Sequence, residues 1–385
     1  MKAQLLAVIV LLAACSGRNE IFYQEENGIS FNDTYTFNVE DRKYIKIDSL
    51  TSYSDIICNC YTGENNEDKL TIYNSWIGRL YLYDYASGIQ EKVIQLHSEG
   101  PNAISSGDFT ATLPLVLNED SIFIFGMHNN KKMSFVNGKG EKTREFSWDG
   151  PNYFFDWTGN AMLMAFKGKI LINGLIGENE QISYNLFELD IENLDTKIRL
   201  PSPKYADELC WGLQYFSFSC NSAHNSLNNT FIHSFGSDHH LYITNTQFEI
   251  IDKHFVGSKY FKNFIPYSFK KSDCLDKYDD RKSHSLNSPK YFKLLHDPYR
   301  DFYYREVLLP RTEEGLRNNS PRNKSIIIID NRFNKVGEYL LPKNTYNTSC
   351  YFITKEGLHL LNTSFNKNQE DSLQFDIIVP VKIKQ

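Results

Sequence analysis

The residues best suited to bind a ligand lie in one short segment, HDPYRDFYYR, at positions 296–305. The segment contains an imidazole, two neighbouring phenols and a guanidinium, which together could bind an anionic ligand or a sugar. The candidate binding residues are His296, Tyr303, Tyr304 and Arg305. Because alternate residues of a strand point to opposite faces, Tyr303 and Arg305 are predicted to share one face.

The same segment also has a structural interpretation, which the sequence favours. Asp297 and Pro298 are typical of a tight turn, because proline fixes φ at the first turn position and aspartate accepts hydrogen bonds from the turn. The segment would then be a hairpin in which Arg305 pairs with a carboxylate and the tyrosines pack between neighbouring sheets.

Asn102 is a further candidate, in the segment EGPNA at residues 99–103. A loop at the rim of the fold could present its side-chain amide to a ligand. The alternative, which the sequence again favours, is a tight connection that needs Gly100 and Pro101 for the shape of its backbone.

Asp238, His239 and His240 stand together, and all three are residue types that bind metals. Neighbouring residues of a strand point to opposite faces, however, so the two histidines could share a metal only in a loop. A polar hairpin turn is therefore the favoured interpretation. The sequence has no GxSxG, HExxH or EF-hand motif, and we predict no metal, no cofactor and no catalytic residue from it.

The chain that must position these residues is predicted to be nearly all-β. Short apolar or alternating runs recur, each bounded by Gly, Asn, Asp or Ser, and no window has a convincing helical period. The runs repeat as a unit, in which an apolar strand ends at an Asp or Asn, a turn follows, and a charged strand begins. The anchors of this repeat are Asp84, Asn137, Asp190, Asn245 and Asp330.

The first four anchors are 53 to 55 residues apart, and a period near fifty with four strands per unit is typical of β-propeller blades. Five anchors predict five blades. A sixth is expected from the N-terminal strand at 34–47 and three C-terminal strands, which would close the ring. The alternatives are seven blades, if the segment 259–289 hides strands, or two packed β-sandwiches.

The segment 259–289 is predicted to be an irregular insertion in the propeller domain, which spans 34–385. Its aromatic side chains could form a binding element on a rigid scaffold, or the insertion could cover one end of the ring. These aromatic residues are Tyr260, Phe261, Phe264, Tyr267 and Phe269.

The first fourteen residues are predicted to be a signal peptide, with one lysine and then an apolar stretch too short to cross a bilayer. The stretch ends in LAAC, residues 12–15, which resembles the lipobox of bacterial lipoproteins. The resemblance implies cleavage before Cys15, lipidation of its thiol, and a tether over 15–33. Ser16, rather than an aspartate, follows the cysteine, so we expect an outer-membrane lipoprotein of the cell envelope, on either face of that membrane.

Six further cysteines leave their pairing open, because an exported protein can form disulfides. Cys58 and Cys60 would lie on one face of a strand. Since no second pair has zinc-finger spacing, buried cysteines with room for one bridge are favoured over a metal site. The six are Cys58, Cys60, Cys210, Cys220, Cys274 and Cys350.

Three features make the chain similar to uncharacterised β-propeller lipoproteins of Gram-negative gut anaerobes, a domain-of-unknown-function family. They are the lipobox, the segment SEGPNAI at 98–104 and the segment at 296–305. Ala103 stands where the resemblance leads us to expect a second glycine, so the turn at 98–104 is expected to differ from the turn of the family. The resemblance covers most of the mature chain. It implies the fold and the cell envelope, but no activity.

The charge composition of the chain argues against one class of partner. The 385 residues include 41 Lys and Arg against 47 Asp and Glu, and this net charge of −6 argues against nucleic acid as a partner. We therefore expect a binding or scaffold module that is held at the membrane by its N-terminal lipid and binds an envelope protein or a glycan. The alternative is an enzyme, a lyase or hydrolase acting on a polysaccharide or peptide at the channel of the ring. The sequence favours binding and leaves the enzyme open.

Overall fold

The structure is a computed structural model that describes residues 33–384 with short gaps. The gaps are residues 55, 64, 105–107, 127–131, 148–152, 155–162, 179–180, 201, 214–216, 218, 313–314, 316–317, 319, 368 and 370. The predicted signal peptide at 1–14, Cys15 and the tether up to residue 32 lie outside the described residues.

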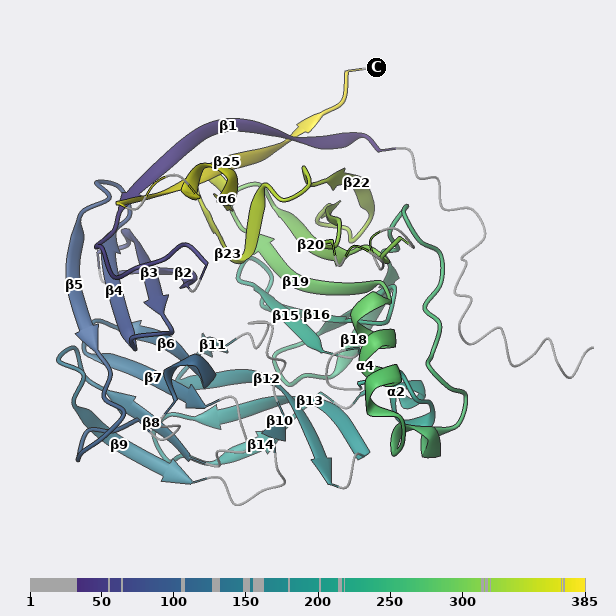
Figure 1. Cartoon of the computed structure of the whole chain (residues 1–385), viewed down its shortest axis with the longest axis horizontal. Helices are drawn as coiled ribbons and strands as arrows, with labels where there is room; N and C mark the ends of the chain where they lie inside the picture. The colour runs from purple at the N-terminus through teal and green to yellow at the C-terminus, as the bar shows by residue number, and fades with distance from the viewer. Residues whose placement is uncertain are drawn as a thin grey trace, which may run out of the picture.

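The described strands form six antiparallel sheets around a ring, so the fold is the predicted six-bladed β-propeller (Figure 1). Blade 1 contains β2 (Ile56–Thr62), β3 (Asp68–Asn74), β4 (Arg79–Asp84) and β5 (Gln90–Gln95). Blade 2 contains β6 (Thr112–Asn118), β7 (Ser121–Gly126), β8 (Lys132–Val136) and β9 (Lys142–Ser147). In blade 3, β10 (Tyr153–Phe154) and β11 (Leu163–Phe166) both pair with β12 (Lys169–Glu178), and β13 (Gln181–Asp190) and β14 (Thr196–Ile198) follow.

The second half of the chain forms the other three blades. Blade 4 contains β15 (Cys220–Asn225), β16 (Thr230–Phe235), β17 (His240–Thr244) and β18 (Ile250–Phe255). Blade 5 contains β19 (Lys290–Asp297), β20 (Phe302–Leu308), β21 (Lys324–Ile329) and β22 (Lys335–Leu340). Blade 6 contains β23 (Tyr346–Thr354), β24 (Gly357–Asn362), β25 (Ser372–Lys382) and β1 (Tyr35–Lys46). The short helices between strands are η1 (Phe109–Ala111), α2 (Lys204–Glu208), η2 (Lys271–Cys274), α4 (Tyr278–Asn287) and α6 (Thr363–Asn366).

One hydrogen-bonding pattern explains the predicted repeat. At the turn between the third and fourth strands of blade 5, Asp330 Oδ1 accepts hydrogen bonds from the backbone NH groups of Arg332 and Asn334, at 3.0 and 2.8 Å. The side chain mimics a backbone turn, which is why Asp or Asn recurs at this position. The corresponding acceptors in blades 1 to 4 are Asp84, Asn137, Asp190 and Asn245.

The position of a strand in its blade decides its hydrophobicity. β21, in the middle of blade 5, has five consecutive buried residues after Lys324, because neighbouring blades cover both of its faces. The outermost strand β18 instead exposes Ile250 and the next three residues. This difference produces the alternation of an apolar strand and a charged strand that is visible in the sequence.

Both ends of the chain close the ring, as predicted. β1 is the outermost strand of blade 6 and pairs antiparallel with β25, from Tyr35 opposite Lys382 to Lys46 opposite Ser372. The pairing continues through one β-bulge and leaves the first and last described strands side by side (Figure 1).

Two disulfides are present, whereas the sequence favoured room for one. Cys58 on β2 is bonded to Cys350 on β23, so this bridge joins blade 1 to blade 6. The second bridge joins Cys210 to Cys274. The pairings connect residues 292 and 64 positions apart, which no local pattern could have indicated.

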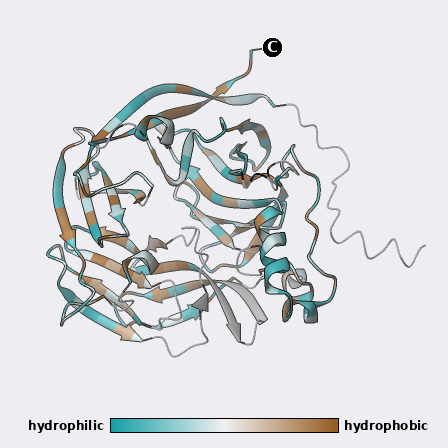
Figure 2. Cartoon of the chain, viewed as in Figure 1, coloured by the Kyte–Doolittle hydropathy of each residue, from teal (hydrophilic) through white to brown (hydrophobic). Residues whose placement is uncertain are grey.

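The segment 259–289 is not irregular throughout, because its residues 278–287 form helix α4. The helix escaped the sequence analysis because its two buried residues, Arg281 and Ser285, are polar, so it has no apolar stripe. Figure 2 shows the helix as largely hydrophilic. The segment, which is described in full, contains no strand, and the seven-blade alternative is therefore wrong. Among the described residues, no helix is long and apolar enough to span a membrane.

Candidate functional site

The predicted hairpin at 296–305 lies between β19 and β20, and Asp297 fixes its turn. Asp297 Oδ1 accepts hydrogen bonds from the backbone NH groups of Tyr299 and Arg300, at 3.1 and 3.2 Å. Its Oδ2 accepts from the hydroxyl of Tyr304 at 2.8 Å. Asp297 is fully buried, so this carboxylate serves the turn.

Arg300 joins this turn to the next blade. Its Nη2 atom donates to the carbonyl oxygens of Lys355 and Glu356, both at 2.8 Å, in the turn between β23 and β24 of blade 6. The DPYR segment therefore has a role in blade-to-blade contact that its turn-forming residues alone did not indicate.

Arg305 is fully buried between blades 5 and 4. Its Nε donates to Ser234 Oγ at 2.8 Å, and its guanidinium carbon lies 3.4 Å from the centre of the Tyr291 ring. Its Nη atoms donate to the backbone carbonyl oxygens of Asp238, His239 and Val256, at 2.6 to 2.9 Å, and to that of His240 at 3.5 Å. The structural interpretation of the sequence predicts a carboxylate partner for Arg305. The structure instead shows its guanidinium donating to backbone carbonyl oxygens.

The structure brings together only two of the four predicted binding residues in this segment. The rings of His296 and Tyr303 are 4.8 Å apart, and Asn225 Nδ2 donates to the Tyr303 hydroxyl at 2.5 Å. Tyr304 lies on the opposite face of β20 and packs edge-on against Phe37 of blade 6. Binding by this group stays a prediction, and its observed contacts are with other side chains, within blade 5 and across to blades 4 and 6.

Asp238, in the turn between β16 and β17, is the acceptor in a buried polar cluster. Its Oδ1 accepts from His240 Nδ1 at 2.9 Å, and its Oδ2 accepts from the hydroxyls of Tyr242, at 2.6 Å, and Tyr205. Burial raises the pKa of Asp238, but the hydrogen bonds from His240 and the tyrosines outweigh it and hold the pKa below its usual value. Asp238 is therefore a carboxylate that fixes the hairpin and the segment before β15.

His239 points away from Asp238 and contacts the insertion. Its Nε2 donates to the carbonyl oxygen of Lys262 at 2.7 Å, and its Nδ1 lies 2.6 Å from the hydroxyl of Tyr291. Burial lowers its pKa to about 4. Within the described ranges, no three His, Cys, Asp or Glu residues are placed to hold a metal ion. The polar hairpin predicted at 238–240 is observed.

Asn102 lies in the connection between blades 1 and 2. Its Oδ1 accepts from the backbone NH of Lys142 at 3.2 Å, so it holds the start of β9. Gly100 has φ of +82°, and the backbone NH of Ala103 closes the turn by donating to Gly100 at 3.1 Å. The turn needs one glycine, at 100, and accepts alanine at 103.

Sequence reasoning missed a buried charged cluster between blades 5 and 6. Lys293, on β19, donates to the carbonyl oxygen of Ser349 at 3.0 Å and lies 4.4 Å above the ring of Tyr351. Burial lowers the pKa of Lys293 to about 8. Glu306 on β20 accepts from the Tyr351 hydroxyl at 3.3 Å and lies 3.6 Å from Lys324. A polar strand position gives no signal that its partner comes from another blade.

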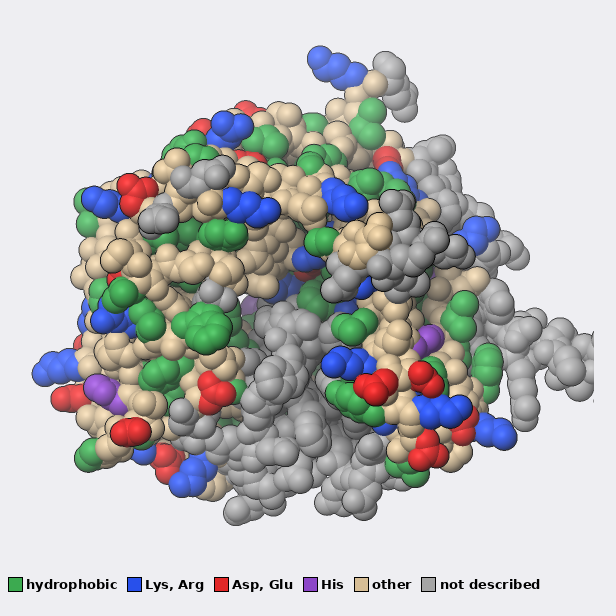
Figure 3. Space-filling view, viewed as in Figure 1, with side chains coloured by type: hydrophobic (Ala, Val, Ile, Leu, Met, Phe, Trp, Pro, Cys, Tyr) green, Lys and Arg blue, Asp and Glu red, His purple; other side chains and the backbone are tan. Residues whose placement is uncertain are grey.

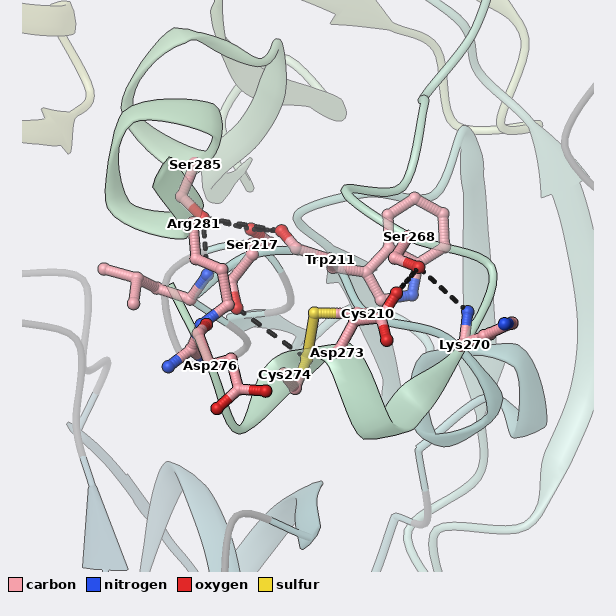
Figure 4. The surroundings of a disulfide bond; sticks show 12 residues. Cys210, Trp211, Ser217, Ser268, Lys270, Asp273, Cys274, Asp276, Arg281 and Ser285 are labelled. Carbon is pink, nitrogen blue, oxygen red and sulfur yellow. Dashed lines mark hydrogen bonds between the residues drawn. A yellow bond between two sulfur atoms is a disulfide. The ribbon is translucent and has the colours of Figure 1, made fainter. Parts of the chain in front are cut away.

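The most distinctive part of the molecule is the covalently fixed helical unit formed by η2 and α4, residues 271–287. The Cys210–Cys274 disulfide joins it to the segment before β15 (Figure 4). Cys210 and Ser268 exchange two backbone hydrogen bonds of 3.0 Å. Ser285 Oγ accepts from the backbone NH of Leu213 at 2.7 Å. The helical unit is therefore held against the ring at both of its ends.

The outer side of the helical unit exposes apolar side chains. Leu275, Tyr278 and Leu286 are 64%, 53% and 40% exposed. Charged side chains of both signs surround hydrophobic ones over α4 (Figure 3). A rigid element that exposes aromatic and aliphatic groups among charges has the composition of a protein interaction surface.

A small pocket lies beside the helical unit, in the loop between β20 and β21. It is lined by residues that include Arg311, Arg322 and Lys343, and it encloses about 90 Å³. Arg322 donates to the carbonyl oxygens of Leu286 and Ser288, which joins this loop to α4. Ligand pockets usually enclose about 300 Å³ or more, so this cavity is too small for an ordinary ligand.

The fold places the protein among six-bladed β-propellers. A family model described as a domain of unknown function, DUF4221, matches residues 26–340, and the chain belongs to this family. The match includes the segments at 98–104 and 296–305, so the family resemblance inferred from them is confirmed.

Two solved structures show the same fold. A DUF4221 member from Bacteroides vulgatus is 19% identical, with a TM-score of 0.71, over 92% of this chain and 100% of that chain. A protein from Bacteroides fragilis, described as exported, is 13% identical, with a TM-score of 0.52, over 94% of this chain and 98% of that chain. No curated protein matches the chain.

Proposed function

We propose that this protein is a lipid-anchored β-propeller of the cell envelope that acts as a binding or scaffold module. Its partner is an envelope protein or a glycan, and it binds on the face that carries the helical unit. The enzyme alternative would need convergent catalytic groups in an open pocket, and no contact among the described residues favours it.

The observation that carries this proposal is the combination of rigidity and apolar exposure in the helical unit. A disulfide and buried hydrogen bonds fix its backbone, so little conformational entropy is lost on binding. Leu275 and Tyr278 remain more than half exposed on it. Such side chains are the kind that supply the central contacts of an interface.

The lipid anchor is supported by the first fifteen residues, which combine a short apolar stretch with the LAAC segment. Several acyl chains on Cys15 would hold the domain on a membrane. Outer-membrane placement follows from Ser16 after the cysteine and stays part of the proposal.

A pull-down from native membranes tests the partner. The full-length protein is purified in mild detergent, and co-purifying proteins and glycans are identified by mass spectrometry. A stoichiometric partner is expected with the unaltered protein and is lost in the variant Leu275→Ser/Tyr278→Ser. The matched control is Leu227→Ser, since Leu227 is 62% exposed in the β15–β16 turn, away from the helical unit. Absence of any partner, or a partner that survives the double substitution, would overturn the proposal.

A further inference from the structure

The segment at residues 259–271, which ends at the first residue of the helical unit, has an unusual composition. Its sequence is KYFKNFIPYSFKK, which holds four lysines and no carboxylate, in a chain whose net charge is −6. It also contains five aromatic residues and one isoleucine. We refer to it as the basic–aromatic strip.

The apolar residues of the strip divide into two sets. Phe261 and Phe264 point inward and pack on the His239 ring, at 5.5 and 4.8 Å between ring centres. Tyr260, Ile265 and Phe269 are 39%, 68% and 59% exposed, respectively. Inward aromatic residues thus fix the strip to the ring while a second apolar set faces outward.

The strip begins at the point where the N-terminal chain enters the fold. The carboxylate of Asp33 forms an ion pair with the ammonium group of Lys259. The next residue, Thr34, donates its backbone NH to the carbonyl oxygen of Val336 at 2.8 Å. Figure 1 shows the strip running along the margin of the ring, from the start of β1 toward α4.

These positions keep the strip within reach of a bilayer that holds a lipid on Cys15. Cys15 precedes Asp33 by 18 residues, which at full extension reach roughly 60 Å. A short connection of this kind raises the effective concentration of the bilayer at the strip. The strip therefore lies at the place where the tether from such an anchor joins the fold.

We infer that the basic–aromatic strip is a membrane-contact surface and that its partner is a bilayer containing anionic phospholipid. Tyrosine and phenylalanine favour the interfacial region of a bilayer, where an apolar ring can enter while polar groups stay hydrated. Lysines near such a surface are attracted by anionic headgroups. Lys262 and Lys270 are exposed, as are Ile265 and Phe269, so the strip offers both charged and apolar side chains to such a surface.

The inference rests on the proposed lipid anchor and adds an orientation to it. With the margin of the ring at the bilayer, the ring stands on its edge. The exposed apolar residues of the helical unit, Leu275, Tyr278 and Leu286, are not part of the strip and remain for a partner. Membrane contact and partner binding therefore use different residues of the insertion.

Depth-dependent quenching tests the contact. The full-length protein with Phe269→Trp is purified with its own lipid and placed in vesicles of phosphatidylethanolamine and phosphatidylglycerol whose acyl chains carry bromine. After subtraction of the unsubstituted protein, the added tryptophan is expected to be quenched. The control variant Leu227→Trp should not be. Equal quenching of the two, or none at position 269, would overturn the inference.

Charge is tested in the same Phe269→Trp protein. Omitting phosphatidylglycerol, or substituting Lys262→Gln and Lys270→Gln, should lower the equilibrium constant for contact between the strip and the bilayer. The expected decrease is about 5-fold per lysine. If neither change reduced the quenching, the inference that lysines attract the strip to anionic headgroups would be contradicted.

The test separates this inference from the proposed function. Mass measurement of the N-terminal peptide reports whether the anchor exists. Quenching at 269 in an unlipidated protein still supports membrane contact. A pull-down partner that shields position 269 from bromolipid would instead identify the strip as a protein-binding surface and overturn the inference.

Discussion

Cys58 and Cys350 form a disulfide between β2 and β23, across 292 residues of sequence. This bond joins the first complete blade to the last one at the place where the ring closes. The closure therefore has a covalent component in addition to the pairing of β1 with β25.

Removing this bond should weaken the whole ring. Cys350→Ser is expected to lower the free energy of unfolding by about 3 kcal/mol, because the unfolded chain loses a long cross-link. Chemical denaturation followed by tryptophan fluorescence measures the change. The control is Cys60→Ser, which removes a free, partly exposed thiol from β2, the strand of Cys58, and should change stability by about 0.5 kcal/mol or less. Equal effects of the two substitutions would contradict a role in closure.

Arg305 should be essential for stability rather than for binding. Arg305→Met would leave the carbonyl oxygens of Asp238, His239 and Val256 buried without this donor, and should cost about 3 kcal/mol or more. Denaturation midpoints measure the loss. Arg42→Met is the matched control, because the Arg42 side chain is 59% exposed. A fully stable Arg305→Met protein with reduced ligand binding would instead support the binding role.

Acid should destabilise the protein through buried neutral histidines. Burial lowers the pKa of both His233 and His359 from 6.5 to about 3. Between pH 6.5 and about pH 3 the unfolded chain binds protons at these histidines that the folded chain does not bind. Stability is therefore lost as the pH falls below 6.5. At pH 5 the loss is about 2 kcal/mol per histidine.

The pH prediction is checked by denaturation midpoints at pH 7 and pH 5. His233 lies between Ser222 and Thr244, at 2.7 and 2.9 Å, so His233→Gln keeps a polar side chain there. The variant should lose part of the pH dependence. The variant His97→Gln, at an exposed position, should keep all of it. An unchanged slope in His233→Gln would refute the assignment.

The turn at 297–300 should behave as a structural element. Asp297→Ala removes an acceptor for two backbone NH groups and for the Tyr304 hydroxyl, and should cost about 2–3 kcal/mol. Pro298→Ala, which only loosens the unfolded chain, should cost about 1 kcal/mol or less. Comparable losses from both would show that the proline, and not the carboxylate, fixes the turn.

The propeller itself was predictable because its determinants are local. Asp330 and its equivalents each bond backbone groups only a few residues away, so the turn is visible in the chain as a repeated residue type. The closing pair of β1 and β25 was predictable by counting, since three terminal strands lacked a fourth.

The contacts of the candidate site were not predictable, because they join different blades. Arg305 bonds carbonyl oxygens about 50 to 70 positions earlier in the chain, and Lys293 meets Ser349. α4 was missed for another reason, since Arg281 and Ser285 on its buried side look like solvent-facing residues. The signal available for the helical unit was its cysteine, Cys274, whose partner the sequence left open.

The entry of the chain at Asp33 and Thr34 also has a mechanical consequence. A force applied to the N-terminal segment first loads the ion pair of Asp33 with Lys259 and the backbone hydrogen bonds of Thr34 with Val336 of β22 and with Ile383. Only after these contacts break would the force begin to separate β1 from β25, one pair at a time from Tyr35 onward. An external force is thus passed to the insertion and to blade 5 before it acts on the pairing that closes the ring.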